Sequence, residues 1–234
     1  MVIQNKNPLA TVIIPVFNSE KYLLETLQSV FKQHYYPFEV IVVDNHSSDK
    51  TESICKNFTE INFFKQPGKG ISDALNYGIE KSRGEYISFI SYDDIWMPEK
   101  LRRQINDMTE NPEIKYTITK VKYFLELGCK LPNKFNKKFL EESYEQYILE
   151  NLVARKSLFD EIGTFDCSFT SGLEIDWFAK AKDKNIQYAI INEVLVKKRV
   201  HDSNTSLNTV NPMHQHLKAM RNSISRKKNK TSCC

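Results

Sequence analysis

The sequence is poor in the features that mark disordered, secreted or membrane-spanning proteins. Its 234 residues include only 7 glycines, while 12% are aromatic, and such a composition does not favour disorder. No apolar run approaches the roughly 20 residues that span a bilayer. The first ten residues lack the charged start and long apolar stretch of a secretory signal. We therefore expect a globular cytoplasmic protein with one sizeable core.

The cysteines also fail to form a pattern with a structural meaning. There are five, an odd number, scattered at positions 55, 129, 167, 233 and 234. A disulfide framework uses an even number of cysteines, and a zinc site places them in closely spaced groups. The adjacent pair at the C-terminus is not a prenylation signal. We therefore assign the cysteines no role.

Acidic residues are absent from the end of the chain. The formal net charge is +4, yet no Asp or Glu follows Asp202, and six basic residues do: Lys218, Arg221, Arg226, Lys227, Lys228 and Lys230. Two interpretations remain open for this basic tail, which are attraction to an anionic membrane surface and a simple solvated end. Nucleic acid is not an expected partner, because no aromatic residues are interleaved with the charges.

The first half of the chain alternates strand and helix patterns. Short runs rich in apolar and β-branched residues predict buried strands at 11–16, 39–44, 61–65 and 86–91. Helical spacing of apolar residues follows these strands, and Pro98 stands where the first turn of a further helix is expected. Strands that alternate with helices predict an α/β fold with a mostly parallel central sheet flanked by helices.

Ligands of such sheets bind at the carboxyl ends of the strands, so the polar residues that follow each strand are the candidates for a site. These are Phe17 and Asn18, Asp44 and Asn45, and Asp93 and Asp94.

The adjacent acids Asp93 and Asp94 are the strongest of these candidates. Two carboxylates at close range raise each other's pKa unless a positive group joins them. Mg²⁺ or Mn²⁺ would relieve this repulsion and would also neutralise a diphosphate leaving group. The other interpretation is that both acids cap the helix expected to begin near Pro98.

Several motifs, in order, resemble those of the family 2 glycosyltransferases of the GT-A fold. TVIIPVFNSEKYLLETLQSV resembles their opening strand and helix, and EVIVVDNHSSDKT resembles their second strand and acidic turn. GKGISDALNYGIEKSRGEYISFISYDD is similar to the helix that leads into their Asp-Xaa-Asp strand end. The resemblance is strong over about residues 10–110 and continues more weakly to RVHDSNTS. It implies one GT-A domain at 1–210, with a nucleotide-binding half (8–110), an acceptor-binding half (111–210) and a basic tail (211–234).

The resemblance also implies which residues hold a nucleotide-sugar donor. Asp44 would accept a hydrogen bond from the uracil N3–H, which thymine presents equally. Phe17 would line the base pocket, and Asp73 would lie beside the nucleotide. The full set implied around the donor is Pro15, Phe17, Asn18, Asp44, Lys69, Asp73, Ser91, Tyr92 and Arg199.

For the metal, the resemblance implies Asp93 as the principal ligand, Asp94 as a support of the metal or the sugar, and His201 as the completion of the shell, with Arg199 near the diphosphate. The other interpretation of His201 is a surface residue at the end of a strand. The chain departs from the family pattern at Ser91, which stands where the first acid of Asp-Xaa-Asp is expected. One carboxylate together with a diphosphate can still hold Mg²⁺.

The resemblance places the catalytic base at the start of a helix in the second half, within LEIDW. Glu174 aligns with the family's acid, and Asp176 is the alternative two residues later. Residues two apart on a helix do not share a face, so only one of them can point at the sugar. Both could instead be ordinary acids at a helix start.

The resemblance implies an inverting transferase that moves a sugar, with a divalent metal, from a UDP-linked donor to a glycan or lipid-linked acceptor. Two alternatives stay open, which are a catalytically weak module that binds a sugar nucleotide or glycan, and a nucleotidyltransferase on a related scaffold. The second would require a phosphate loop rich in Gly and Arg after the first strand, where the sequence has PVFNSE. Trp96 and Trp177 belong either to an acceptor groove or to the core.

Overall fold

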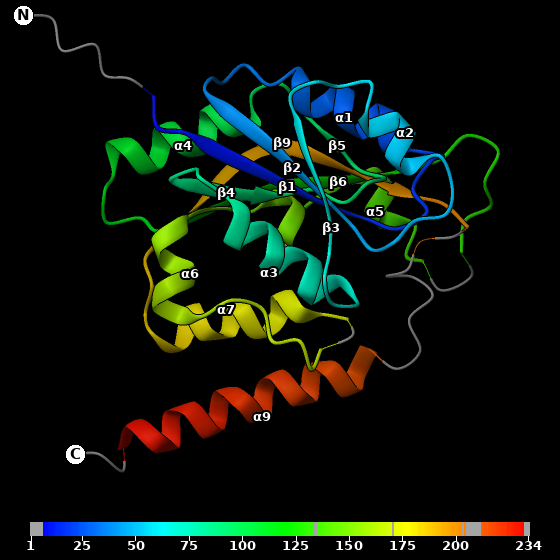
Figure 1. The fold of residues 1–234 in the computed structure, drawn as a ribbon. Coiled ribbons are helices and arrows are strands. Elements are labelled where there is room, and N and C mark those ends of the chain that lie inside the picture. The colour runs from blue at the N-terminus through cyan, green and yellow to red at the C-terminus, as the bar shows by residue number, and fades with distance from the viewer. Residues whose placement is uncertain (1–6, 133–134, 170, 203, 205–211, 232–234) are drawn as a thin grey trace, which may run out of the picture.

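The computed structural model describes residues 7–132, 135–169, 171–202, 204 and 212–231, which form a mixed β-sheet with helices on both faces (Figure 1). The strands are β1 Ala10–Val16, β2 Phe38–Asp44, β3 Ile61–Lys65, β4 Tyr86–Phe89, β5 Ile95–Trp96, β6 Tyr116–Leu125, β7 Ser143–Glu145, β8 Val153–Arg155 and β9 Tyr188–Val200. The helices are α1 Leu23–Phe31, α2 Thr51–Cys55, α3 Ile71–Lys81, α4 Lys100–Glu110, α5 Lys138–Glu141, the 3-10 turn η1 Leu149–Asn151, α6 Lys156–Ile162, α7 Leu173–Asp183 and α9 Pro212–Thr231.

The strand order is β3-β2-β1-β4-β8-β6-β9-β5, with β7 added beside β6. The first four strands in this order are parallel neighbours, as the alternating pattern predicts. Strand β8 enters antiparallel, whereas β9 runs parallel to β6. The α/β class with a mostly parallel sheet is therefore confirmed, and the carboxyl ends of β1, β2 and β4 lie at one edge.

Strand β1 builds the core because its side chains alternate between two apolar faces. Val12 and Ile14 pack in a cluster with residues of α1 and α4, while Ile13 packs in another with residues of α3, α6 and α7. Figure 1 shows α1, α2 and α4 on one face of the sheet and α3, α6 and α7 on the other. Trp96 and Trp177 are 2% and 0% exposed, so both belong to the core and not to an acceptor groove.

The second half rests on a long parallel pair, β6 and β9. The sequence favoured two separate strands near 188–191 and 194–201, but the structure has one strand, Tyr188–Val200. Its register against β6 shifts around Lys120, which lets a single strand cover both patterns. Strand β9 ends at the acid pair and delivers Lys198, Arg199 and His201 there.

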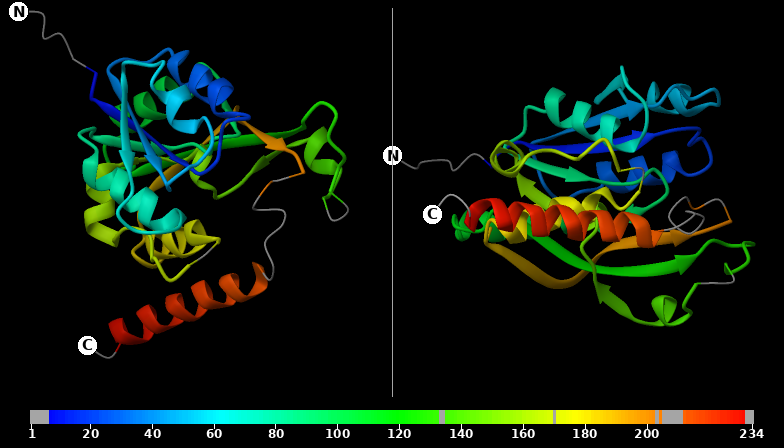
Figure 2. Two further views of the ribbon diagram at one scale, coloured as in Figure 1. Left: turned by 45° about the vertical axis from the view of Figure 1, so that its right-hand side comes forward. Right: turned by 90° about the horizontal axis from the view of Figure 1, so that it is seen from below.

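The basic tail of the sequence analysis contains a helix, α9, that packs along α7 (Figure 2). Ala219 is 1% exposed in this contact, and Arg226 pairs with Asp176 and Asp183 of α7. The positive charge therefore has acidic partners on another helix, which its local sequence does not reveal. None of the helices in the described ranges is both long and apolar enough to cross a membrane.

Candidate active site

The turns after β1 and β2 are joined by direct hydrogen bonds. The backbone N–H of Asn18 donates to Ser47 Oγ at 2.8 Å, and Asn18 Oδ1 accepts from the Ser48 N–H at 2.9 Å. Asn18 has a φ of 48°, a left-handed conformation that Asn tolerates better than most residues. Asn18 thus fixes the two turns as one surface at the carboxyl edge of the sheet.

The predicted base-pocket residues on this surface differ in exposure. Phe17 is 54% exposed and Pro15 is half-buried, so an aromatic face is available to a ligand. Asp44 is fully buried, and its carboxylate accepts hydrogen bonds from the Ser47 N–H and hydroxyl. A contact between Asp44 and a base therefore requires the Ser47 turn to move, and this role stays a prediction.

Lys69 and Asp73 lie together at the start of α3. The Lys69 N–H donates to Asp73 Oδ2 at 3.0 Å, and the Cys167 thiol donates to Oδ1 at 3.0 Å. These two hydrogen bonds lower the pKa of Asp73, so the group is an anion. Lys69 itself is exposed. The structure shows Asp73 organising this loop, and a contact with the nucleotide stays a prediction for both residues.

Asp93, which follows β4, and His201, which follows β9, lie in direct contact. His201 Nε2 lies 3.0 Å from Asp93 Oδ2, and Asn204 Nδ2 donates to the same oxygen at 3.2 Å. His201 is 1% exposed and Asp93 is 8% exposed. Within the described part of the chain, no hydrogen bond engages Asp93 Oδ1. Asp93 therefore keeps one carboxylate oxygen available beside an imidazole.

Asp94 points away from this pair and into a buried charge cluster. Its Oδ2 accepts from Lys198 Nζ at 2.8 Å, and its Oδ1 accepts from the Arg199 N–H at 3.0 Å. Lys198 Nζ also lies 3.0 Å from Glu150 Oε1, which accepts a hydrogen bond of 2.6 Å from the Ser91 hydroxyl. Both oxygens of Asp94 are thus occupied, which fits support of the acid turn better than metal ligation.

The Lys198 ammonium group in this cluster contacts the carboxyl groups of both Asp94 and Glu150. Burial works against charging Lys198, but Asp94 and Glu150 raise its pKa well above the usual range. Burial likewise opposes ionisation of Glu150, yet Lys198 and the Ser91 hydroxyl lower its pKa. Burial raises the pKa of Asp94 to about 7 against the pull of Lys198. Lys198 therefore pairs with both carboxyl groups, at 2.8 Å with Asp94 and at 3.0 Å with Glu150.

Arg199 and Tyr92 hold the backbone around Asp93. The Arg199 guanidinium donates to the Asp93 carbonyl through Nε at 2.9 Å and pairs with Glu25 and Glu126. The Tyr92 carbonyl accepts from the Thr26 hydroxyl at 2.7 Å. Since the Arg199 side chain is 3% exposed, the structure gives it a positioning role, and contact with a diphosphate stays a prediction.

Glu174 and Asp176, the two candidate bases, face different surroundings. Glu174 is half-buried, and burial raises its pKa, with Glu150 and Lys198 close enough to influence it. Asp176 is 1% exposed and pairs at 3.1 Å with both Lys180 and Arg226. Glu174 is thus within electrostatic range of Glu150 and Lys198, whereas Asp176 joins α7 to α9.

The possible metal ligands at the site suit a cation that binds together with a diphosphate. Among the described residues, no three His, Cys, Asp or Glu side chains surround a common point. Asp93 offers its Oδ1, and the His201 imidazole beside it would exchange its contact with Asp93 Oδ2 for the metal. Mg²⁺ commonly takes one or two carboxylates and completes its shell with phosphate oxygens and water. These two residues therefore fit a cation bound to a diphosphate and do not form a cage of their own.

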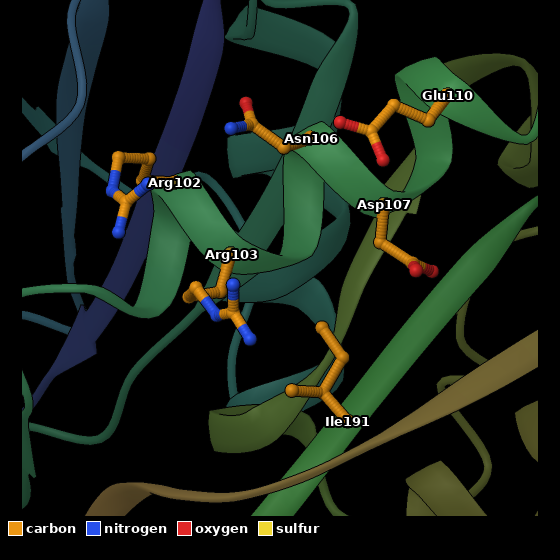
Figure 3. Close-up of a pocket in the computed structure, with 6 residues that line it drawn as sticks. All are labelled: Arg102, Arg103, Asn106, Asp107, Glu110 and Ile191. Carbon is orange, nitrogen blue, oxygen red and sulfur yellow. The ribbon is translucent and has the colours of Figure 1, made fainter.

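A hollow of about 280 Å³ lies elsewhere, along α4 (Figure 3). Its lining is mostly charged, and one of the lining residues, Arg103, also pairs with Glu193. None of the candidate residues lines it, so we interpret this hollow as a solvated helix surface. The residues that line it are Arg102, Arg103, Asn106, Asp107, Glu110 and Ile191.

Comparisons with known proteins place the chain in a family. The model of Glycosyl transferase family 2 matches residues 11–170. An uncharacterized glycosyltransferase of Rickettsia typhi is 32% identical over 223 residues, which are 90% of this chain and 70% of that protein. The chain belongs to glycosyl transferase family 2.

One further relative and one solved structure are similar to this family 2 glycosyltransferase over different shares of its length. A putative teichuronic acid biosynthesis glycosyltransferase, TuaG of Bacillus subtilis, is 32% identical over 111 residues, 45% of this chain and 44% of its own. The crystal structure of S. aureus TarS in complex with UDP-GlcNAc matches with a TM-score of 0.72 at 21% identity, over 92% of this chain and 65% of that chain. At this identity the likeness confirms the GT-A fold alone.

The site of this family 2 glycosyltransferase also contains three residues that the sequence did not single out. Glu150 and Asn204 reach Ser91 and Asp93, and Lys198 reaches Asp94. Lys198 could have been found from KKRVH, because polar residues at the end of a strand are candidates for a site. Glu150 follows no motif, because its place depends on the path of η1 through the fold.

The different surroundings of the two acids on α7 predict that Asp176→Asn affects stability and not chemistry. Removing one partner of a buried ion pair costs on the order of 3–5 kcal/mol. We expect the urea unfolding free energy to fall by about 3 kcal/mol, with turnover of the folded enzyme retained. The exposed acid Asp160 on α6 offers a matched control, Asp160→Asn. Loss of turnover at unchanged stability would show instead that Asp176 takes part in the reaction.

Proposed function

We propose that this enzyme transfers a sugar from a UDP-linked donor to a hydroxyl group of a glycan or lipid-linked acceptor, with inversion and with help from Mg²⁺ or Mn²⁺. The observation that carries the proposal is the convergence of Asp93 and His201 at the sheet edge, next to the buried Lys198 and Glu150 whose charges also influence Glu174. We place the activity in the cytoplasm, at or near a membrane surface.

The donor and acceptor classes are supported by the relatives. TarS has been crystallised with UDP and with UDP-GlcNAc, and TuaG is named for teichuronic acid biosynthesis. On the protein side, Phe17 offers an exposed ring at the nucleotide end of the site. We therefore propose a uracil nucleotide as the donor carrier and polysaccharide biosynthesis as the process.

In this reaction the acceptor oxygen attacks the anomeric carbon while the bond from that carbon to the diphosphate breaks. We assign Glu174 as the base that accepts the proton of the acceptor hydroxyl. Its raised pKa suits this task, because a base works best when its pKa is close to the operating pH. Asp93 and His201 would hold the metal, which neutralises the charge that develops on the leaving diphosphate.

We further propose that Glu150 supplies the negative charge that the family pattern places at residue 91. The Ser91 hydroxyl donates to Glu150 Oε1 at 2.6 Å, so the Glu150 carboxylate lies within hydrogen-bonding distance of the strand end. Lys198 keeps Glu150 ionised and fixes its position. In this arrangement a serine and a distant glutamate together replace one aspartate.

The role of Glu174 is tested with Glu174→Gln. Loss of a positioned general base should reduce turnover by about 10²–10⁴-fold, while UDP affinity and stability stay unchanged.

Wild-type UDP-sugar hydrolysis with Mn²⁺ should fall as the pH drops through the raised pKa of Glu174, above the usual glutamate range, since only the ionised form accepts a proton. The matched control is the exposed acid Glu161, as Glu161→Gln. If Glu174→Gln turns over donor as fast as wild type, the assignment is wrong. If the wild type turns over no donor at all, the chain is a binding module.

A double-mutant cycle of Ser91→Asp and Glu150→Gln tests whether Glu150 replaces the aspartate that the family pattern has at residue 91. Ser91→Asp alone sets two carboxylates against each other, and Glu150→Gln alone removes the carboxylate. The double variant restores one acid at the strand end with an amide donor beside it. We expect it to exceed both single variants in kcat/KM for donor hydrolysis, with a coupling of about 1–3 kcal/mol. Additive losses in the double variant would contradict the exchange.

A further inference from the structure

Helix α9 attaches to the protein through a polar inner face. Arg226 Nη1 pairs with Asp176 at 3.1 Å, and its Nε pairs with Asp183 at 2.9 Å. The Ser223 hydroxyl donates to Asp183 at 2.8 Å, and Ala219 fills the contact at 1% exposure. These residues recur at intervals of three and four, so they form one face of the helix.

The outer face of α9 carries large apolar side chains in solvent. Leu217, Met220 and Ile224 are 44%, 61% and 53% exposed. Their spacing of three and four residues places them in one row, opposite the inner face. An amphipathic helix of a globular protein ordinarily turns its apolar row to the core. Here the polar side faces the protein, and the apolar row faces outward.

Basic residues flank this apolar row on both sides. At 100° per residue, Lys227 follows Met220 on one side, and Lys228 and Arg221 follow Leu217 on the other. All three are exposed, and Lys227 also lies 3.4 Å from Asp183. The sequence of α9 contains no acidic residue. The outer face therefore combines an apolar row with positive borders.

We propose that this face of α9 docks the enzyme in the plane of an anionic phospholipid surface. Helices with an apolar face bordered by Lys and Arg bind in the interface of membranes, through both apolar burial and attraction to anionic headgroups. The row of Leu217, Met220 and Ile224 would enter the headgroup boundary. Arg221, Lys227 and Lys228 would contact phosphate groups.

The charge of α9 favours a lipid surface over a second copy of the chain. Two α9 helices packed through their apolar rows would bring like charges together at both borders, which is unfavourable. An anionic bilayer presents the complementary charge. Figure 2 shows α9 as the outermost element beside α7, so its outer face can meet an extended surface.

Docking of this kind would bring the candidate base close to the membrane. Helix α7 carries Glu174 in its first turn and lies directly against α9. Packed helices lie about 8–10 Å apart, so α7 would be one helix layer from the lipid. This last point rests on the proposed function and fits an acceptor carried by a lipid.

The inference is tested by flotation of the full chain with vesicles. We expect binding to vesicles of equal parts phosphatidylglycerol and phosphatidylcholine, little binding to phosphatidylcholine alone, and weaker binding at high salt. The variants L217S/M220S/I224S and R221Q/K227Q/K228Q should each lose most of this binding. Their matched controls are Leu127→Ser, where the leucine is 98% exposed, and K32Q/K137Q/K138Q at exposed lysines away from α9.

Two measurements separate this inference from the proposed function and from misfolding. Circular dichroism melting should be unchanged in L217S/M220S/I224S, while R221Q/K227Q/K228Q should remain folded with only a small loss from the contact between Lys227 and Asp183. UDP-sugar hydrolysis without lipid should match that of the wild type in both. Equal flotation of wild type and variants, or no flotation with anionic vesicles, would overturn the inference. A dimer in sedimentation that L217S/M220S/I224S converts to a monomer, without lipid binding in either, would show that a second copy covers the row.

Discussion

The candidate active site depends on one buried ammonium group, that of Lys198. It lies between Asp94, which ends the acid turn, and Glu150, which belongs to η1, and it is carried by β9. Three segments that are distant in the sequence therefore meet at one cation. Without it, two buried carboxylates would face each other uncompensated, which is strongly unfavourable. This contact places the end of β9, and with it His201, against Asp93.

The same arrangement separates the roles of the two adjacent acids. Asp94 has both oxygens in hydrogen bonds to β9, so it anchors the turn, while Asp93 keeps an oxygen available beside His201. Arg199 extends this anchor through the Asp93 carbonyl to Glu25 of α1. The Asp93 side chain is thus held between a turn anchored by Asp94 and a backbone carbonyl bound by Arg199.

Features of the fold and the site were predictable from the sequence where they depend on residues that are close together in the chain. The parallel strands and the positions of Phe17, Asn18 and Asp93 follow from local apolar runs and strand ends. The pairing of Ser91 with Glu150 and that of Asp176 with Arg226 each join residues at least fifty positions apart. No local pattern encodes such contacts. The folding of the basic C-terminal segment onto α7 was missed for the same reason, since its acidic partners lie on another helix.

We infer that Asp93 and His201 hold a cation together with the diphosphate of the donor, and isothermal titration of UDP into the enzyme, with and without Mn²⁺, measures this. Mn²⁺ should strengthen UDP binding at least about tenfold, on the order of 1.4 kcal/mol, in the wild type and in the control Asp160→Asn. In Asp93→Asn this gain should disappear, while binding without metal stays the same. An equal Mn²⁺ effect in Asp93→Asn, or no effect in the wild type, would show that these residues do not hold the cation.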